Sequence, residues 1–329
     1  MSSQAVYWFH SWSGSLMKYV IQPFIRQDLA AFRNLHEQDR TSPTVDRVLT
    51  QEEDTFGDET LRRMVAREGL AVLGYSYVAR SLWNPQGNFQ SEVFVRQDAR
   101  KEGIGSALIN EVVSWAKAHG AATLTAWVSS EPTQYLQFAE RHNFRVVQRF
   151  VTMVLEVRNA DERVLEERLE AARQQGVSLF SFADTGKTDA ARHKLYELNR
   201  RLAPYLPGNG DEFPSFEEYE KEIIEADWFR ADGQLIAADD DHWMGLVGLG
   251  FYDEGKRLHN EFTAVDPSYR RRGVAQALKA WSVILARTLG ANEIRTGNDA
   301  SNEAIIGVNR QLGYRFEPGV VKLQRTLID

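Results

Sequence analysis

Two stretches of the sequence decide how this chain is organised: RKEGIGSAL at residues 100–108 and RRRGVAQAL at residues 270–278. The second begins 170 residues after the first, and the same offset places Gly290-Ala291 on Gly120-Ala121 without a gap. At average protein composition, Arg-x-x-Gly-x-(Gly or Ala) arises by chance at roughly one position in a thousand. Two copies in one register therefore indicate an internal repeat within the 329 residues.

The two halves also share a predicted order of secondary structure. Each half should contain an opening strand, a helix, a β-hairpin, a short apolar strand, the repeated loop with its helix, and one further strand. The strands and first helix are expected at residues 19–24, 28–38, 69–79, 92–95 and 124–128, and again at residues 177–182, 188–202, 243–252, 262–265 and 293–296. Asp28 and Thr188 are the expected helix N-caps. We therefore expect an α/β (α+β) fold of two tandem domains, each a mixed, mostly antiparallel sheet flanked by helices.

Domain boundaries are indicated by the repeat and by changes in composition. Residues 1–17 are aromatic-rich and differ in composition from the rest of the chain, so we treat them as an N-terminal extension. The repeats then predict domains at residues 18–157 and 177–329. A charged, helix-prone segment at residues 158–176 is expected to link them.

Composition excludes several kinds of chemistry. The chain has no cysteine, which removes disulfides and thiolate nucleophiles, and its seven histidines show no metal-ligand spacing, so we expect no metal. A net charge of −7 disfavours nucleic-acid binding and favours a cationic substrate. No apolar run approaches the ~20 residues that span a membrane, and the N-terminus lacks the basic start of a signal peptide. We expect a cytoplasmic protein, a monomer or homodimer, with no membrane partner.

The repeated loop predicts a site for an anion. A helix that comes after a turn of small residues has first-turn N–H groups without partners, and its dipole adds partial positive charge there. Gly or Ala lets a diphosphate approach this backbone closely, and basic side chains at 100–101 and 270–272 could neutralise its charge. The alternative is a tight turn with solvated basic side chains. A Rossmann site is disfavoured because Leu108 and Leu278 stand where its third glycine is required.

The succession of strand, loop, helix and strand, followed by NEAIIGVNRQLGY at residues 302–314, resembles the acetyl-coenzyme A signature of the GNAT superfamily of N-acyltransferases. The resemblance covers about residues 18–157 and 177–329. It implies that acetyl-CoA is the acyl donor, with its pantetheine arm on the strand before the loop and its pyrophosphate on the loop. The positions so implied are Phe94, Val95, Arg100, Lys101, Gly103 and Gly105 in the first half, and Thr263, Ala264, Val265, Arg270, Arg271, Arg272, Gly273, Val274, Ala275 and Asn302 in the second.

Two departures from the family pattern separate the halves. The Asn that commonly meets the cofactor is Asn302 in the second half but Pro132 in the first, and Pro has no N–H to offer. The family's usual Tyr acid corresponds to Asn309 and to Ala139. Asn309 could donate a hydrogen bond, whereas Ala139 can only pack. We therefore expect the second half to carry acyl transfer and the first to bind cofactor weakly or serve as a scaffold.

Acetyl transfer to an amine requires a base, and a carboxylate is the usual choice. Glu261, on the strand beside the expected thioester position, is the first candidate, and Glu92 is its near counterpart. A backbone N–H near Val265 could hold the oxyanion, and Tyr252 could reach the thiolate.

The predicted function is N-acetylation of a small-molecule amine through a ternary complex. A non-catalytic coenzyme A-binding sensor and a protein or peptide N-acetyltransferase are the alternatives. The two missing Tyr positions favour the first of these, and an open groove would favour the second.

Overall fold

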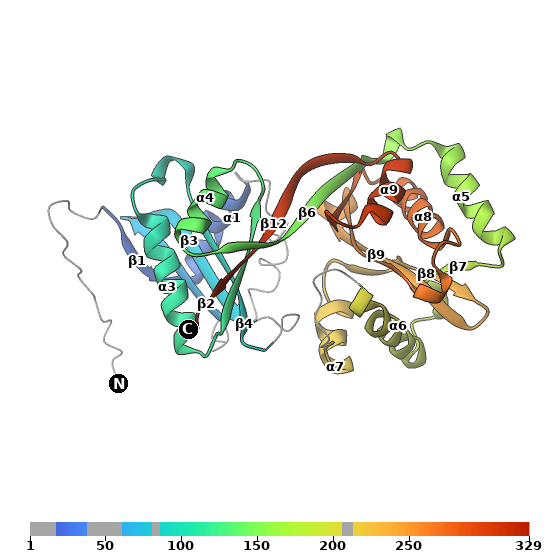
Figure 1. Ribbon diagram of the computed structural model, residues 1–329, viewed down its shortest axis with the longest axis horizontal. Coiled ribbons are helices and arrows are strands. Elements are labelled where there is room, and N and C mark those ends of the chain that lie inside the picture. The colour runs from blue at the N-terminus through green and yellow to red at the C-terminus, as the bar shows by residue number, and fades with distance from the viewer. Residues whose placement is uncertain (1–17, 38–60, 81–85, 206–212, 329) are drawn as a thin grey trace.

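The computed structural model describes residues 18–37, 61–80, 86–205 and 213–328 (Figure 1). Within them, twelve strands form one sheet in the order β1-β2-β3-β4-β5-β12-β6-β11-β10-β9-β8-β7. The pairs β4/β5 and β10/β11 are parallel, and all other neighbours are antiparallel. The predicted mixed, mostly antiparallel sheet is confirmed. The predicted extension, residues 1–17, lies outside the described residues.

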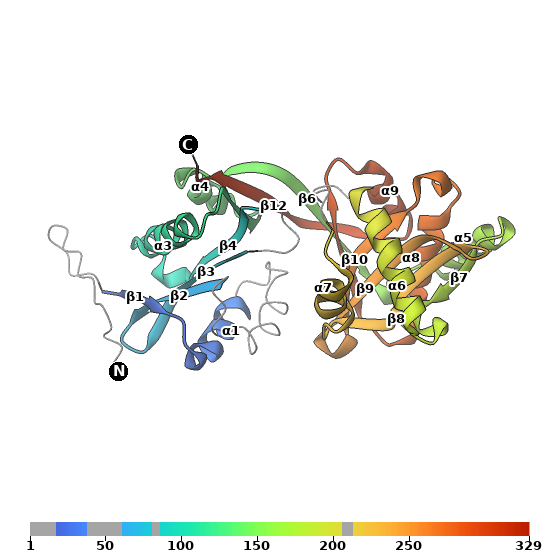
Figure 2. The same cartoon turned by 90° about the horizontal axis from the view of Figure 1, so that it is seen from below.

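Each half contributes six strands and its own helices. The strands are β1 (Val20–Pro23), β2 (Leu61–Glu68), β3 (Ala71–Arg80), β4 (Asn88–Val95), β5 (Thr123–Ser129), β6 (Arg145–Glu156), β7 (Ser178–Ser181), β8 (Phe229–Asp239), β9 (His242–Tyr252), β10 (Arg257–Val265), β11 (Glu293–Asp299) and β12 (Arg315–Thr326). The α-helices of the described residues are α1 (Leu29–Glu37), α3 (Ile104–Ala118), α4 (Gln134–Arg141), α5 (Glu162–Gln174), α6 (Asp189–Leu202), α7 (Phe216–Tyr219), α8 (Val274–Thr288) and α9 (Glu303–Gln311). In the first half, α3 and α4 cover one face of the strands and α1 lies on the other (Figure 2). In the second half, α8 and α9 lie on one face and α6 and α7 on the other (Figure 1).

The two halves exchange their last strands. β6 pairs with β11 of the second half, and β12 pairs with β5 of the first. Met153 lies opposite Thr296, and Leu323 lies opposite Ala126, so both pairings keep the offset of the sequence repeat. β6 and β12 also pair with each other, and Figure 1 shows these two long strands running between the lobes. Each half therefore depends on the other to complete its sheet.

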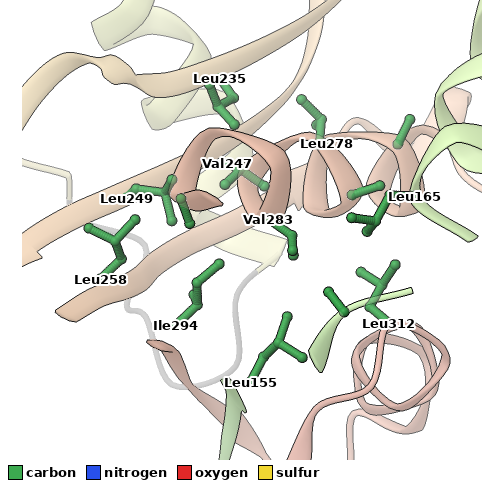
Figure 3. Packing of buried hydrophobic residues seen from close by; sticks show 14 of the residues in the cluster. Leu155, Leu165, Leu235, Val247, Leu249, Leu258, Leu278, Val283, Ile294 and Leu312 are labelled. Atoms are coloured by element: carbon green, nitrogen blue, oxygen red, sulfur yellow. The ribbon is translucent and has the colours of Figure 1, made fainter. Parts of the chain in front are cut away.

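The hydrophobic core of the second half shows the same dependence. Leu278 and Val283 of α8 pack against strand residues such as Ile294 (Figure 3). Leu155 of β6 and Leu165 of α5 belong to the same cluster. The predicted linker thus contains a helix, α5, which packs on α8 and helps to close this core.

The helix N-caps were predicted with mixed success. Thr188 caps α6, because its side chain accepts a hydrogen bond from the Ala191 N–H at 3.2 Å. The carboxylate of Asp28 instead accepts from the Ile25 N–H at 3.0 Å, in the turn before α1. Asp28 is 2% exposed and forms an ion pair with Arg67 of β2, so it fastens the start of the first domain to the sheet.

Candidate active site

The two repeated loops fold alike. Lys101 and Arg271 have φ values of 69° and 63°, and Gly103 and Gly273 come next with 84° and 76°. Each glycine is the N-cap of the next helix, α3 or α8, in the left-handed region that a side chain would strain. The sequence repeat is therefore a repeat of backbone conformation.

The start of each loop helix presents backbone N–H groups to an anion. Among the described residues, no side chain caps α3 or α8, and neither has an acidic residue in its first turn. The first helical hydrogen bond of α8 is donated by Ala277 to the Gly273 carbonyl, at 2.9 Å. The amides of Val274, Ala275 and Gln276 precede it and are available to a ligand.

The first arginine of each loop holds the loop itself. Arg100 Nε donates to the Val95 carbonyl at 3.0 Å, and Arg270 Nε donates to the Val265 carbonyl at 3.1 Å. The next basic residue of the second loop, Arg271, is exposed. Of the predicted phosphate-binding arginines, Arg271 is thus the one whose charge is most available at the loop.

In both halves the parallel strands diverge before they reach the loop. β10 pairs with β11 only from Arg257 to Asn260, opposite residues 293–296. Beyond Asn260 the side of β10 that faces β11 has no ladder partner among the described residues, although β10 continues to pair with β9. β4 and β5 separate in the same way after Ser91. A flexible ligand could lie in either split and hydrogen bond to Thr263–Val265 or its counterpart as an added strand.

The second split is the gap between β10 and β11 beyond Asn260, and we call the point where their pairing ends its apex. Glu261 is the first residue of β10 past this point. The register of β10 against β9 shifts between Asn260 and Phe262, so Glu261 occupies a β-bulge, a feature enriched beside active sites. Tyr252 Oη donates to Glu261 Oε1 at 2.5 Å, and His259 Nδ1 lies 3.4 Å from the same oxygen. A Cβ on Gly250 would come within 2.9 Å of Glu261 Oε1, so the carboxylate needs glycine beneath it. Tyr252, considered as an acid for the thiolate, thus binds the carboxylate.

Glu92 has different surroundings. β4 keeps an unbroken register with β3, in which Glu92 lies opposite Tyr77. Burial, with a smaller contribution from the charge of Glu92, raises the pKa of Tyr77. The first half therefore carries a carboxylate near the split but no bulge at it.

The apex of the second split is polar on the face covered by α8. Asn260, Thr296 and Asn298 are each at least nine-tenths buried there. The Nδ2 atoms of Asn260 and Asn298 have no hydrogen-bond partner among the described residues. Buried donors without partners are uncommon and mark a place where a ligand or water completes the set. Sequence reasoning missed these residues.

The equivalent positions of the first half are less polar. By ladder register they are Ser91, Ala126 and Val128. The Ser91 hydroxyl is already bonded to the Thr125 carbonyl at 3.2 Å, and Ala126 and Val128 pack against the hydrophobic core. Comparing the sequences of the two halves position by position could have identified the polar residues at the apex, because the first half has small or apolar residues there.

One further position leaves more space in the second half, and the start of α3 is crowded in the first. A Cβ on Gly297 of β11 would meet nothing within 4 Å, whereas the equivalent Trp127 packs its ring 5.1 Å from that of Phe150. In the first loop, a Cβ on Gly105 would lie 3.1 Å from the ring of Phe138, so that ring crowds the start of α3.

The two asparagines predicted downstream have local partners. Asn302 caps α9, its Oδ1 accepting from the Ile305 N–H at 3.3 Å. Asn309 is fully buried, with Nδ2 3.7 Å from Met153 Sδ of β6. Its predicted hydrogen bond to cofactor or substrate stays a prediction that this burial does not favour.

The described residues contain neither a metal cluster nor a membrane-spanning helix. No group of three His, Asp or Glu side chains there could hold a metal ion. None of the helices in that part of the chain is long and apolar enough to cross a membrane.

A protein-family model matches both halves of the chain. The model described as "Acetyltransferase (GNAT) family" matches residues 29–144 and again residues 204–314. The chain therefore belongs to the GNAT family, in a tandem arrangement, and is an acyltransferase. This confirms the predicted family and enzyme class, and does not support the alternative of a non-catalytic sensor.

Individual relatives agree with this assignment. The chain is 24% identical over 253 residues to a mycothiol acetyltransferase of Actinosynnema mirum, covering 76% of this chain and 79% of that protein. It is 24% identical over 235 residues to the enzyme of the same name from Renibacterium salmoninarum, covering 68% of this chain and 63% of the relative.

Solved structures show the same fold over nearly the whole chain. A GCN5-related N-acetyltransferase from Sphaerobacter thermophilus has a TM-score of 0.72 at 18% identity, covering 95% of this chain and 96% of that one. A tandem GNAT protein from the clavulanic acid biosynthesis pathway has a TM-score of 0.70 at 18% identity, covering 94% and 99%. The tandem fold of this chain is therefore one that other GNAT proteins adopt.

Proposed function

We propose that this acyltransferase moves an acetyl group from acetyl-CoA to the amine of a small molecule, and that the reaction takes place in its second half. One observation carries the choice of half: among the strands that the structure describes, β10 alone combines a divergent parallel pair with a bulged carboxylate, Glu261, at the apex. The domains remain those proposed from the sequence, residues 18–157 and 177–329, each lending its last strand to the other.

The donor would lie along the unpaired edge of β10. The amides of Val274, Ala275 and Gln276 would bind the pyrophosphate together with the exposed charge of Arg271. The edge at Thr263–Val265 offers main-chain groups to the pantetheine arm, whose amides are suited to strand-like hydrogen bonds. This places the thioester end at the apex, beside Asn260.

The chain's own groups then match the needs of amide formation. Glu261 would take the proton from the attacking amine, and Tyr252 would keep the carboxylate oriented through its 2.5 Å hydrogen bond. The N–H groups available to the thioester carbonyl are those of the unpaired edge and the partnerless Nδ2 atoms of Asn260 and Asn298. With no cysteine in the chain, direct attack within a ternary complex is the simplest route.

The acceptor would reach Glu261 from the face that carries α6 and α7. His259 and Gly250 lie on this face beside the carboxylate, and the open position at Gly297 is on the neighbouring strand. A net charge of −7 attracts an ammonium group. The relatives named as mycothiol acetyltransferases support a small-molecule acceptor. The first half would act as scaffold and supply β6.

The test compares matched variants, Glu261→Gln and Glu92→Gln, in a thiol-release assay with acetyl-CoA and a panel of amines that includes peptides. Removal of a general base costs about 10²–10⁴-fold, so we expect Glu261→Gln to lower kcat by at least about 100-fold. Its affinity for acetyl-CoA, measured by calorimetry, should be unchanged, and Glu92→Gln should retain activity. Loss of activity in Glu92→Gln alone would move the reaction to the first half. Turnover of peptides alone would replace the acceptor class.

A further inference from the structure

His259 of β10 lies beside the proposed base, on the face of the sheet that carries α6 and α7. Its Nδ1 is 3.4 Å from Glu261 Oε1, the same oxygen to which Tyr252 Oη donates at 2.5 Å. This nitrogen is buried and makes no hydrogen bond within the described part of the chain. Contacts between catalytic groups are often long without substrate and shorten in the complex. The His259 ring is therefore placed to hold the carboxylate.

The backbone beneath the carboxylate brings these groups together. Gly250 lies opposite His259 in the ladder of β9 and β10, and Tyr252 follows two residues later on the same face. A Cβ at Gly250 would lie 2.9 Å from Glu261 Oε1. The oxygen thus lies over a glycine and has the Tyr252 hydroxyl and the His259 ring as polar neighbours. Contacts from two residues to one oxygen restrict the rotation of the carboxylate.

Glu261 is an extra residue of the second half. Asn260 and Ser91 correspond, because each is the last residue of its parallel ladder. Asn260 lies ten residues before Arg270, whereas Ser91 lies nine residues before Arg100. The additional residue is Glu261, at the bulge of β10.

The neighbours of this carboxylate differ between the halves as well. The ladders place Gln90 at the position of His259, and Ala79 at the position of Gly250. Ala79 carries the Cβ for which Glu261 leaves no room at Gly250. The fold therefore accepts a residue that does not titrate and a Cβ at these two positions. Because histidine and glycine occur where the carboxylate occurs, we relate the histidine to the carboxylate and not to the sheet.

Glu261 is the charged group on which His259 acts most directly. The ionisable residues that flank His259 on its own and the neighbouring strands are Tyr252, Arg257, Glu261, Glu293 and Arg295. Arg295 lies opposite His259 on β11 and donates to Glu293 at 3.2 Å. Arg257 Nε lies 3.4 Å from a carboxylate oxygen of Asp253. Both arginines thus interact with other carboxylates.

We propose that His259 is a positioning residue for acetyl transfer, which together with Tyr252 holds Glu261 in the orientation that takes the proton of the acceptor amine. The inference rests on the proposed function, in which Glu261 is the base. In the neutral form, an Nδ1–H group donates to Oε1 and orients the carboxylate. In the cationic form, the ring pairs with the carboxylate and weakens it as a base. Because histidine changes charge between about pH 5 and 8, turnover should rise as His259 loses its proton.

The experiment compares His259→Asn with His259→Leu in the thiol-release assay, using the amine that the wild type turns over fastest. The Asn side chain places an N–H group near the position of Nδ1 and does not titrate, whereas Leu has no donor. We expect His259→Leu to lower kcat at pH 8 by about 10- to 100-fold, and His259→Asn by less than about threefold. The KM for acetyl-CoA should be unchanged in both.

The same two substitutions at His242 are the matched control. His242 Nε2 lies 3.9 Å from Asp266 Oδ2 at the other end of β9, so it is also a histidine beside a carboxylate. Its variants should keep the wild-type kcat and pH profile.

The pH profile separates positioning from packing. Protonation of the amine lowers the rate of every variant at low pH, and His259 adds a further ionisation where it is present. Below about pH 6, the slope of log(kcat/KM) against pH should therefore be greater by about one in the wild type than in His259→Asn. A wild-type slope in His259→Asn would make His259 a packing residue.

Nitrogen-15 NMR of the histidine rings tests the contact without turnover. Glu261→Gln removes the charge beside Nδ1, so the Nδ1 resonance of His259 should move at pH 8 while that of His242 stays. A His259 resonance that does not move would contradict the contact. If Glu261→Gln retains activity, the proposed base is wrong and this inference fails with it. If Glu261→Gln is inactive while His259→Leu keeps full kcat, the role of His259 alone is overturned.

Discussion

Replacing Lys279 with isoleucine should stabilise the protein, although most substitutions in a core destabilise. Burial lowers the pKa of Lys279 from its ordinary value of 10.5 to about 7. At about 1.4 kcal/mol per pKa unit, keeping this ammonium charged in the core costs up to about 5 kcal/mol at neutral pH. The variant removes that cost and installs the side chain that the first half already packs at the same position, Ile109.

The stability gain should depend on pH with a defined sign. Between pH 7 and 10.5 the unfolded chain binds a proton at Lys279 and the folded chain does not, so wild-type stability rises with pH. Below pH 7 both states are protonated and the cost is constant, and above pH 10.5 both are neutral and it vanishes. The advantage of Lys279→Ile should therefore be largest at pH 7 and below, and shrink by up to about 1.4 kcal/mol per pH unit as pH rises.

Urea unfolding followed by circular dichroism at pH 7, 8, 9 and 10 measures this effect. Lys194→Met serves as the control, because Lys194 is exposed and its replacement should give no such pH dependence. A variant that is less stable than the wild type at pH 7, or an advantage that does not change with pH, would refute the argument that a charged lysine is buried here at a cost.

Two further perturbations test the site and the fold. Gly297→Trp installs the side chain that stands at the equivalent position of the first half and fills the open position beside Glu261. It should lower kcat/KM for the acceptor by about 10-fold or more, while the affinity for acetyl-CoA stays constant. Unchanged kinetics would mean that the acceptor binds elsewhere. Arg67→Met leaves the buried carboxylate of Asp28 without its partner and should destabilise the protein by about 3 kcal/mol in urea unfolding, whereas a change below about 0.5 kcal/mol would show that the ion pair contributes little.

The repeat was readable from the sequence because its chemistry is local. The loop needs glycine at Gly103 and Gly273, and the apolar strands and helices around it have periodicities that a single half reveals. The position of Glu261 next to the apex was also predictable from its place on the strand.

The strand exchange was not readable, because the offset of the sequence repeat is the same whichever half β6 and β12 complete. Pairing between strands is a long-range choice that alternation alone does not encode.

The polar apex was hidden for a different reason. Asn260 and Asn298 resemble surface residues in the sequence, and only the alternation along β10 and β11 turns them toward the covered face of the sheet. Similarly, the charge and sequence position of Arg270 suggested a phosphate ligand, but its Nε donates a hydrogen bond to the Val265 carbonyl, five residues earlier. Side-chain partners of this kind depend on the closed loop and not on its composition.

A crystal structure of the full chain with acetyl-CoA is the most direct test of where the chemistry takes place. We expect density for the donor between β10 and β11, with its pyrophosphate on the amides of residues 274–276 and its thioester beside Glu261 and Asn260. Donor bound only between β4 and β5, at saturating concentration, would contradict a reaction centre in the second half.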